Sequence, residues 1–567
     1  MESESRGRLF YFFIALVLFF FFLKLVELQI FRHGEYGRFA DENASRVSRI
    51  RAPRGIIYDR FDRVLVRNRP VFSLLFFPDE LLEEDRQRVL WDLSRKTGIS
   101  YQELFAKVSS SKALSYEGVK LISDLPPRSV TKIKESAETL PGVKIVVYPL
   151  RDYPHKSSGV QMLGSIGEIN RRELDALGPG YRSGDLIGKD GLEKVYDSYL
   201  RGVEGGEKLE VDAFGQPIRM IETLEPIAGN NIALTIDSEL QDAVDDFMKG
   251  KNGAVVVLDP KNGEILSMVS HPAYDPMQEW EKINQRSHPF MNRALSAYPP
   301  GSIFKSIVLQ AALAENKFRA GETITCHGFR KMGNRIARCW KEGGHGTLTY
   351  VEGLVWSCDV AFYELALRLG PDTIASFARK FGLGTKTGID LPNEKAGLVP
   401  DKTWKKEKLK QIWFEGETIN YGIGQGYLLV TPIQMASVYA EIATGKRFKP
   451  YLVKEIYDAE GKVIFQNSPE EVGAAGIFPE IRQALREVVD RATGRAAKVE
   501  GLPASGKTGT AENPGLPHAW FLCYAPSDDP EIVISVFVEH GEHGDRSAAQ
   551  VAGQILQWYK KNRLSRS

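Results

Sequence analysis

The chain has 567 residues, of which 43% are hydrophobic and 26% are charged, and these values are ordinary for a globular protein. Its 74 Lys and Arg residues are balanced by 73 Asp and Glu residues, which argues against a nucleic-acid-binding protein because such proteins carry a basic excess. Four cysteines in a chain of this length exclude a disulfide-dense secreted scaffold.

The N-terminal segment is apolar enough to cross a membrane. Residues 9–23 form an unbroken apolar run, and weaker apolar character continues past Lys24. A membrane-spanning helix needs roughly 17–25 residues, and a lysine side chain can extend toward the lipid headgroups. A cleaved signal peptide is the alternative, but no small-residue cleavage site follows the run. We therefore expect an uncleaved single-pass anchor over 9–31, with the basic segment 1–8 in the cytoplasm.

Two further domains are expected after the anchor. The first, over 32–222, begins with basic, strand-like sequence and contains an amphipathic helix at 83–97. Near residue 223 the sequence changes to alternating strands and helices, which continue to the C-terminal end. The second domain, over 223–567, is long enough for a large hydrophobic core.

The second domain opens with clear local signals. A strand over 231–237 precedes a helix for which Ser238 is the expected N-cap. Residues 253–260 and 263–270 are predicted to form two strands, and the Asn-Gly dipeptide between them is typical of a hairpin turn.

The first motif with catalytic potential is Tyr-Pro-Pro-Gly-Ser-Ile-Phe-Lys at 298–305, which precedes a strongly helical stretch. Ser302 is therefore expected at a helix N-terminus, where free N–H groups favour an anionic intermediate, with Lys305 on the same face. A serine hydroxyl needs an adjacent base, and a lysine can serve only where burial or a second cation lowers its pKa. Alone, this motif occurs very often by chance, and it favours an N-cap serine followed by a surface lysine.

Two later motifs change that balance. Residues 357–359 are Ser-Cys-Asp, followed by an apolar helix, and 505–511 are Ser-Gly-Lys-Thr-Gly-Thr-Ala, followed by a strand-like segment. In chain order the three motifs offer a nucleophile, a base, a proton relay and an anchor for a carboxylate. The ordered set matches the Ser-x-x-Lys, Ser-x-Asn, Lys-Thr-Gly signature of penicillin-recognising acyltransferases.

On these motifs the chain resembles the class B penicillin-binding proteins, and among them the elongation-type transpeptidases. The resemblance covers essentially the whole chain. It implies an α+β transpeptidase domain, with an antiparallel sheet between helices, on an elongated pedestal (dimerisation-like) domain with a membrane anchor. The supporting segments are 54–60, 188–193, 255–260, 299–305, 415–418, 422–427 and 431–435.

The resemblance also assigns roles to individual residues. It implies that Ser302 is acylated, that Lys305 is its base, and that Ser357 relays the proton to the leaving group. Backbone N–H groups of Ser302 and Thr510 would hold the oxyanion. The implied catalytic residues are Ser302, Lys305, Ser357, Asp359 and Lys507, and the implied substrate-binding residues are Thr508, Gly509 and Thr510.

One residue departs from the general signature. Asp359 stands where Ser-x-Asn has an asparagine, as it does in elongation-type members, whereas division-type members usually keep the amide. An ionised carboxylate cannot donate a hydrogen bond as an amide can. Asp359 therefore does not supply the amide donor that the general signature offers to a substrate.

The implied function is that of a serine D-Ala-D-Ala transpeptidase that cross-links peptidoglycan stem peptides during cell elongation and is a target of β-lactams. The implied location is the cytoplasmic (inner) membrane, with the catalytic domain in the periplasm or outside. The implied partners are a rod-shape glycosyltransferase and other elongation-complex proteins, with no nucleic acid. No cofactor is expected for the chemistry, and a D,D-carboxypeptidase side activity is compatible with it.

Other functions are compatible with the same motifs. A β-lactam sensor would acylate without turnover, but it needs a signalling domain across the membrane, and only the short segment 1–8 precedes the anchor. A structural activator of a partner glycosyltransferase would act through the pedestal and can coexist with catalysis. A hydrolytic β-lactamase is expected to be smaller and to lack the pedestal.

Three cysteines and a histidine predict a structural zinc site. Three thiolates and one imidazole close a tetrahedral zinc site without an open position. Three alternatives remain: a Cys326–Cys339 disulfide, unpaired buried thiols, or His327 as the nitrogen ligand. Cys523 lies in a predicted core strand and is expected to be a buried apolar side chain. The predicted ligands are Cys326, Cys339, His345 and Cys358.

Overall fold

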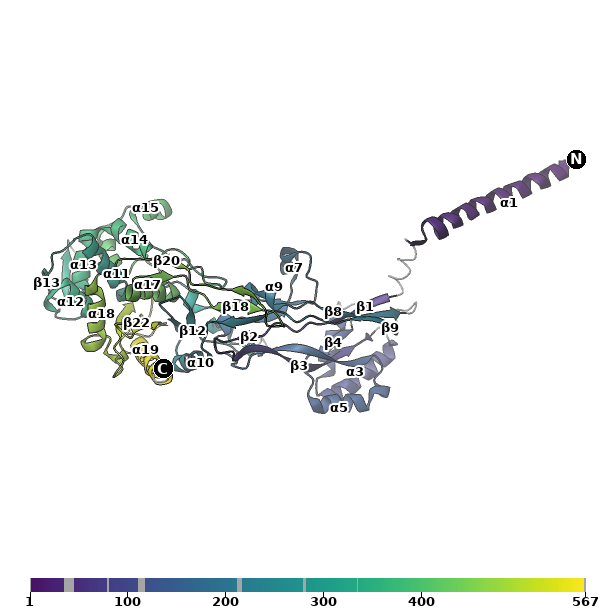
Figure 1. The fold of residues 1–567 in the computed structure, drawn as a ribbon, viewed down its shortest axis with the longest axis horizontal. Helices are drawn as coiled ribbons and strands as arrows, with labels where there is room; N and C mark the ends of the chain where they lie inside the picture. Colours follow the sequence, from purple (N-terminus) through teal and green to yellow (C-terminus); the bar gives the residue numbers. More distant parts are fainter. Residues whose placement is uncertain are drawn as a thin grey trace. The chain divides into compact units, whose positions relative to one another are not determined.

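The structure is a computed structural model that describes residues 2–34, 45–78, 81–110, 118–211, 217–278, 282–333 and 335–564 (Figure 1). It contains two compact units, and several stretches of the chain contribute to each. The smaller unit comprises Met1–Arg54, Asn68–Leu150 and Gly202–Gly229, and the larger comprises Gly55–Arg67, Arg151–Arg201 and Asn230–Ser567.

The predicted apolar anchor is helical. Helix α1 (Glu2–Val26) continues into a π-helical turn, η1 (Glu27–Phe31). The segment Phe10–Phe31 has a mean hydropathy of 2.3, and none of it is buried against the rest of the protein. Within the described ranges it is the one helix long and apolar enough to cross a membrane.

The smaller unit combines a three-stranded antiparallel sheet with a separate helical cluster. The sheet has the order β1-β8-β9. The predicted amphipathic helix is confirmed as α3, which buries Val89, Leu90 and Leu93 in a core shared with α4, α5 and β4. The elements are β1 (Ser45–Ile50), β8 (Gly205–Val211), β9 (Pro217–Leu224), α3 (Glu83–Thr97), α4 (Tyr101–Ser110), β4 (Val119–Ile122), α5 (Pro127–Glu135) and β5 (Val143–Asp152).

The larger unit is organised around a five-stranded antiparallel sheet with the order β12-β11-β23-β22-β21. The predicted hairpin is confirmed by the first two strands, and Gly263 in its turn has a φ of 84°. A second sheet has the order β19-β18-β10-β2 in this unit. The strands are β11 (Gly253–Leu258), β12 (Ile265–His271), β21 (Ser505–Ala511), β22 (His518–Ala525), β23 (Ile532–Val538), β2 (Ile57–Tyr58), β10 (Asn231–Leu234), β18 (Val453–Tyr457) and β19 (Val463–Gln466).

Helices cover both faces of the five-stranded sheet, as the α+β prediction requires (Figure 1). Side chains alternate along β11: Val255 and Val257 pack with α10 and α19, whereas Val256 packs on the other face in the core that contains α11 and α17. The helices are α10 (Ser238–Met248), α11 (Lys305–Ala314), α17 (Pro432–Thr444), α18 (Pro479–Arg491) and α19 (Ala548–Asn562).

Shorter elements complete the larger unit. Around the cysteine cluster lie β13 (Thr323–Cys326), β14 (Phe329–Met332), β15 (Arg335–Arg338), β16 (Gly346–Thr349), α12 (Tyr350–Val355), α13 (Asp359–Leu369) and α14 (Pro371–Lys380). Elsewhere in the unit lie α6 (Val160–Leu163), β6 (Ile166–Glu168), α7 (Arg171–Leu177), β7 (Leu186–Gly188), α8 (Gly191–Val195), α9 (Asp197–Leu200), α15 (Lys402–Trp404), α16 (Glu415–Gly422), β17 (Arg447–Phe448) and β20 (Glu471–Gly473).

One predicted helix cap is wrong. The N-cap of α10 is Asp237, whose carboxylate accepts a hydrogen bond from the Leu240 N–H at 3.3 Å. Ser238 is instead the first helical residue, and its hydroxyl donates to Asp59 Oδ2 at 2.6 Å. Asp and Ser cap helices about equally well, so a tertiary contact decides between them.

Candidate active site

Ser302 is placed by a tight turn that precedes α11. It lies in a 3-10 helix, η7 (Gly301–Phe304), and is half-buried between fully packed neighbours. Gly301 has a φ of +59°, and a Cβ there would lie 2.5 Å from the carbonyl oxygen of Thr510. Its N–H donates to the Gly424 carbonyl at 2.9 Å. Only glycine allows this approach, so the turn brings Ser302 beside strand β21.

Lys305 is buried completely and joins the first motif to the second. Its Nζ donates to Asp359 Oδ1 at 2.7 Å and to the Ser357 carbonyl at 2.8 Å, and it lies 3.4 Å from Ser357 Oγ. No hydrogen bond joins it to Ser302 in the part of the chain that the structure describes. The ammonium group is therefore fixed on the Ser-x-Asp motif.

Ser357 has a backbone conformation that non-glycine residues rarely adopt. Its φ is 55°, in the left-handed region, which costs roughly 1–3 kcal/mol. The strained turn directs the Ser357 carbonyl toward both Lys305 Nζ and Trp340 Nε1, the latter at 3.0 Å. The next helix, α13, begins at Asp359, so the turn also sets the position of that carboxylate.

Trp340 was not predicted from the sequence, yet it contacts the second motif twice. Its backbone N–H donates to Asp359 Oδ2 at 2.8 Å, and its indole N–H donates to the Ser357 carbonyl. Both carboxylate oxygens of Asp359 therefore accept hydrogen bonds, one from Lys305 and one from Trp340. An asparagine offers one acceptor oxygen, so this arrangement accounts for an aspartate at this position.

The third motif lies on β21, an edge strand of the five-stranded sheet. Lys507 is fully buried, and burial together with the positive charge of Lys305 holds its pKa well below its ordinary value. Thr508 is nearly buried, and its hydroxyl lies 2.7 Å from that of Thr493, another residue that the sequence did not single out. A Cβ at Gly509 would lie 3.0 Å from the Pro300 carbonyl, which keeps the strand close to the nucleophile turn. An edge strand can pair with an extended peptide.

The predicted zinc ligands come together. One ligand atom from each of the four residues lies within 4.8 Å of all the others. His345 Nδ1 lies 3.7 Å from Cys326 Sγ and 3.6 Å from Cys339 Sγ. All four cysteines of the chain are free, so the structure does not contain the alternative Cys326–Cys339 disulfide. The three-sulfur, one-nitrogen set fits a tetrahedral zinc ion.

The cluster also favours a deprotonated ligand. A hydrogen bond from the Cys358 thiol lowers the pKa of the Cys339 thiol well below its ordinary value, and thiolates are the form that binds metals. His327 is exposed and is not part of the cluster. Cys523 is fully buried in β22, as predicted.

The sequence of the chain matches two protein-family models and a known relative. The family model described as penicillin-binding protein transpeptidase domain matches residues 253–557, and the model described as penicillin-binding protein dimerisation domain matches residues 49–234. The chain is 32% identical to the peptidoglycan D,D-transpeptidase MrdA of Acinetobacter baumannii, over 98% of this chain and 88% of the relative.

Two solved structures show the same fold. The complex between penicillin-binding protein 2 and MreC from Helicobacter pylori matches with a TM-score of 0.81 and 27% identity, over 92% of this chain and 100% of that chain. A structure described as showing the coordination of polymerization and crosslinking by a peptidoglycan synthase complex matches with a TM-score of 0.73 and 29% identity, over 98% of this chain and 99% of that chain.

Proposed function

The chain belongs to the penicillin-binding protein transpeptidase family, and we propose from this membership that it is a peptidoglycan D,D-transpeptidase of cell elongation and a target of β-lactams. The observation that carries the proposal is the convergence of three distant motifs, in which a buried Lys305 holds the strained Ser357 turn beside the Ser302 turn and strand β21.

A product analysis tests this function against the alternatives. Purified protein is incubated with glycan strands that carry pentapeptide stems, and the digested products are separated and weighed. A transpeptidase releases D-Ala and forms cross-linked muropeptides, and a β-lactam abolishes both. Release of D-Ala without cross-links would indicate a carboxypeptidase, and acylation by penicillin without release would indicate a sensor.

The proposed mechanism follows the order of the motifs. Ser302 Oγ attacks the penultimate D-Ala carbonyl, and D-Ala leaves as the acyl-enzyme forms. Lys305 first passes a proton to Asp359 Oδ1, which lies 2.7 Å from its Nζ, and as the neutral amine it then accepts the serine proton. Ser357, whose hydroxyl lies 3.4 Å from Lys305 Nζ, passes a proton to the leaving amine. The amine of a neighbouring stem peptide then takes the acyl group from the serine.

The remaining site residues bind the substrate and stabilise the oxyanion. Backbone N–H groups of Ser302 and Thr510 hold the oxyanion. Lys507 contributes a positive potential, and the hydroxyls of Thr508 and Thr510 bind the terminal carboxylate while the substrate pairs along β21 at Gly509. Asp359 keeps Lys305 in place until substrate arrives, because its carboxylate holds the ammonium at 2.7 Å.

We also propose that the cysteine and histidine cluster binds one structural zinc ion. Cys358 lies between the proton-relay residue and Asp359, so a metal bond to Cys358 would fix the catalytic turn to the loop that carries Cys339 and Trp340. The chemistry of acyl transfer would not pass through the metal. Its role would be to preserve geometry, which catalysis needs to within about 0.5 Å.

Metal analysis checks this zinc proposal. Protein purified without added metal is expected to contain about one zinc per chain. The Cys358→Ser variant is expected to lose most of the zinc and to be acylated more slowly by penicillin. Cys523→Ala is the control, because Cys523 lies in the core and outside the cluster. Absence of zinc, with a Cys326–Cys339 disulfide found by mass spectrometry, would contradict the proposal.

For the chain as a whole we propose the division 1–8, 9–31, 32–222 and 223–567. The segment 1–8 would be cytoplasmic, 9–31 would anchor the protein in the inner membrane, and the rest would lie in the periplasm or outside. The family models that match 49–234 and 253–557 support the separation into a pedestal and a transpeptidase domain.

The pedestal is the proposed contact with elongation-complex proteins, including a rod-shape glycosyltransferase. One of the similar solved structures is a complex of penicillin-binding protein 2 with MreC. In the smaller unit of this chain, three aromatic rings stack in series: Trp91 on Tyr101 at 4.9 Å and Tyr101 on Phe105 at 5.9 Å. Trp91 is 58% exposed and Phe105 is 45% exposed. Exposed clustered aromatics are typical of protein interfaces.

A double substitution tests this surface. Trp91→Ala with Phe105→Ala is expected to leave penicillin labelling at the wild-type rate and to abolish co-purification with the elongation-complex proteins of the same cell. Met220→Ala is the control, because Met220 is a similarly exposed apolar side chain of the smaller unit. Full co-purification and normal cell shape with the double variant would rule out this surface.

A further inference from the structure

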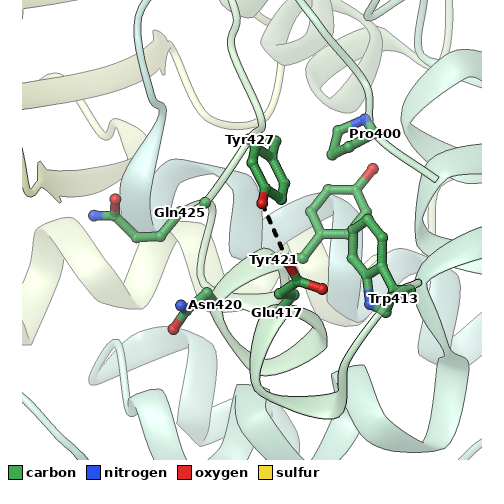
Figure 2. A pocket seen from close by; sticks show the side chains of 8 residues that line it. Pro400, Trp413, Glu417, Asn420, Tyr421, Gln425 and Tyr427 are labelled. Atoms are coloured by element: carbon green, nitrogen blue, oxygen red, sulfur yellow. Dashed lines mark hydrogen bonds between the residues drawn. The ribbon is translucent and has the colours of Figure 1, made fainter. Parts of the chain in front are cut away.

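A pocket of about 180 Å³ lies in the larger unit close to the nucleophile turn (Figure 2). It is formed by α16, by the loop that follows this helix, and by two residues that precede it, Pro400 and Trp413. Its lining residues are Pro400, Trp413, Glu417, Asn420, Tyr421, Gln425, Gly426 and Tyr427.

The pocket shares its wall with the catalytic site. Tyr421 stacks on Phe304, two residues after the nucleophile, with ring centroids 5.7 Å apart and planes 6° from parallel. The Gly424 carbonyl, in the loop between Tyr421 and Gln425, accepts the Gly301 N–H. These two contacts join the pocket wall to the turn that carries Ser302.

The aromatic walls are held rigidly. The indole N–H of Trp413 donates to Thr418 Oγ1 at 2.8 Å, and the Trp413 ring lies 6.1 Å from that of Tyr421. The Tyr427 hydroxyl donates to Glu417 Oε1 at 3.2 Å (Figure 2). A preformed pocket that combines aromatic rings with a few polar groups is a usual form of a small-ligand site.

The pocket carries no unbalanced charge. The carboxylate of Glu417 pairs with Lys405, a lysine that is 1% exposed, and also accepts the backbone N–H of Phe414 at 2.8 Å. The amine of Lys405 further lies 4.9 Å from the centre of the Phe414 ring. An occupant of this pocket would therefore be neutral.

Polar groups without partners remain in the lining. The Tyr421 hydroxyl is buried, with the residue 1% exposed, and it has no hydrogen-bond partner in the described ranges. A buried hydroxyl without a partner costs about 1–3 kcal/mol, so a ligand that supplies one is favoured. At the mouth, Asn420 is exposed, and its side-chain amide makes no hydrogen bond within the described part of the chain.

We propose that this pocket binds one N-acetylated sugar ring of the glycan strand whose stem peptide occupies the catalytic site, an inference that rests on the proposed function. The C–H face of a sugar ring packs on the electron-rich faces of Trp413 and Tyr427, as their ring quadrupoles favour. Sugar hydroxyl and acetamido groups can both donate and accept, which suits the Tyr421 hydroxyl and the Asn420 amide. A stem peptide carries carboxylates, which a neutral pocket without a free cation does not favour.

Direct binding tests the proposal without catalysis. A tetrasaccharide of N-acetylglucosamine, which carries N-acetylated rings and no charge, is titrated into the full-length protein, and binding is followed by saturation-transfer NMR. Tyr421→Phe and Asn420→Ala are each expected to weaken binding roughly three- to tenfold, the loss of one hydrogen bond. Tyr421→Phe should keep or raise the unfolding temperature, because it removes only the unpaired hydroxyl.

The control is Tyr457→Phe, the same change on β18, outside the pocket lining. It is expected to bind the tetrasaccharide like the wild type. Penicillin labelling of the same samples reports separately on the proposed function, because it depends on Ser302 and needs no sugar. Absence of tetrasaccharide binding, binding as tight as that of the wild type by both pocket variants, or displacement of the sugar by a free stem pentapeptide would each overturn the proposal.

Discussion

Replacement of Ser302 by alanine is expected to abolish covalent labelling by a fluorescent penicillin. The substitution removes the hydroxyl that we propose forms the acyl bond, and it leaves the turn intact because Gly301 and its hydrogen bond to Gly424 are unchanged. Gel fluorescence and intact-protein mass measure the loss, which we expect to be complete within detection. Unfolding temperature should stay within about 1–2 °C of the wild type, because only a half-buried hydroxyl is removed.

A second serine on the same segment provides the control. Ser306 comes one position after Lys305, is fully buried, and shares a 3.1 Å hydrogen bond with the Tyr439 hydroxyl. Ser306→Ala should label normally, although it is expected to lower stability by about 1 kcal/mol through the lost bond. Labelling that persists in Ser302→Ala and maps to Ser357 would overturn the assignment of the nucleophile.

Much of the fold could be predicted because its local signals agree with its tertiary structure. The hairpin of β11 and β12 follows from an Asn-Gly turn between two apolar runs, and α3 follows from its periodic apolar face. The prediction of the N-cap of α10 was wrong because two adjacent residues, Asp237 and Ser238, have nearly equal capping propensity. Which of the two residues caps the helix depends on Asp59, which is distant in the sequence and accepts a hydrogen bond from the Ser238 hydroxyl.

In the site, too, the residues that stand in motifs were predicted, and the residues that act through tertiary contacts were not. The spacing and order of the motifs predicted one site for Lys305 and the Ser-x-Asp turn and one cluster for the four predicted zinc ligands, and in the fold each of these two groups lies close together. Trp340 and Thr493 were missed because neither stands in a motif, and each acts through a contact that only the folded chain creates. The signal that could have found Trp340 was its place directly after a predicted metal ligand.

Asp359 replaces the asparagine of the general Ser-x-Asn signature, and the structure changes how this replacement is interpreted. From the sequence alone, the aspartate at position 359 means only that the amide donor of an asparagine is missing. In the fold it has two acceptor oxygens and uses both, one for a buried ammonium and one for a backbone N–H. Its charge also balances Lys305 in a region that contains a second buried lysine, and it raises the proton affinity of Lys507 against the effect of burial.

Lys507→Met is expected to slow penicillin acylation about 10²–10³-fold and, at the same time, to raise the unfolding temperature by several degrees. The acylation rate falls because a cation beside the oxyanion and the carboxylate site is lost. Stability rises because Lys507 is fully buried and, among the described residues, has no counterion of its own: its amine donates only to the neighbouring Thr508 carbonyl at 3.1 Å. Methionine fills a similar volume without the cost of burying a charge.

Lys405→Met is expected to change the unfolding temperature in the opposite direction to Lys507→Met. Lys405 is equally buried, but it pairs with Glu417. Its removal leaves a carboxylate uncompensated, so Lys405→Met is expected to lower the unfolding temperature. If both variants shifted stability in the same direction, pairing would not be what separates these two lysines.

The pH dependence of stability provides a further test of Lys507. Its pKa in the folded protein lies below the value of an unfolded lysine, so between these two values the unfolded chain binds one more proton than the folded chain. Wild-type stability therefore gains from Lys507 as pH rises through this window, whereas Lys507→Met lacks that gain. The difference in unfolding temperature between variant and wild type should be largest at the low-pH side of this window and should shrink toward about pH 10, where an unfolded lysine also begins to lose its proton. A difference that stayed constant over this range would show that charge burial is not the cause of the stabilisation.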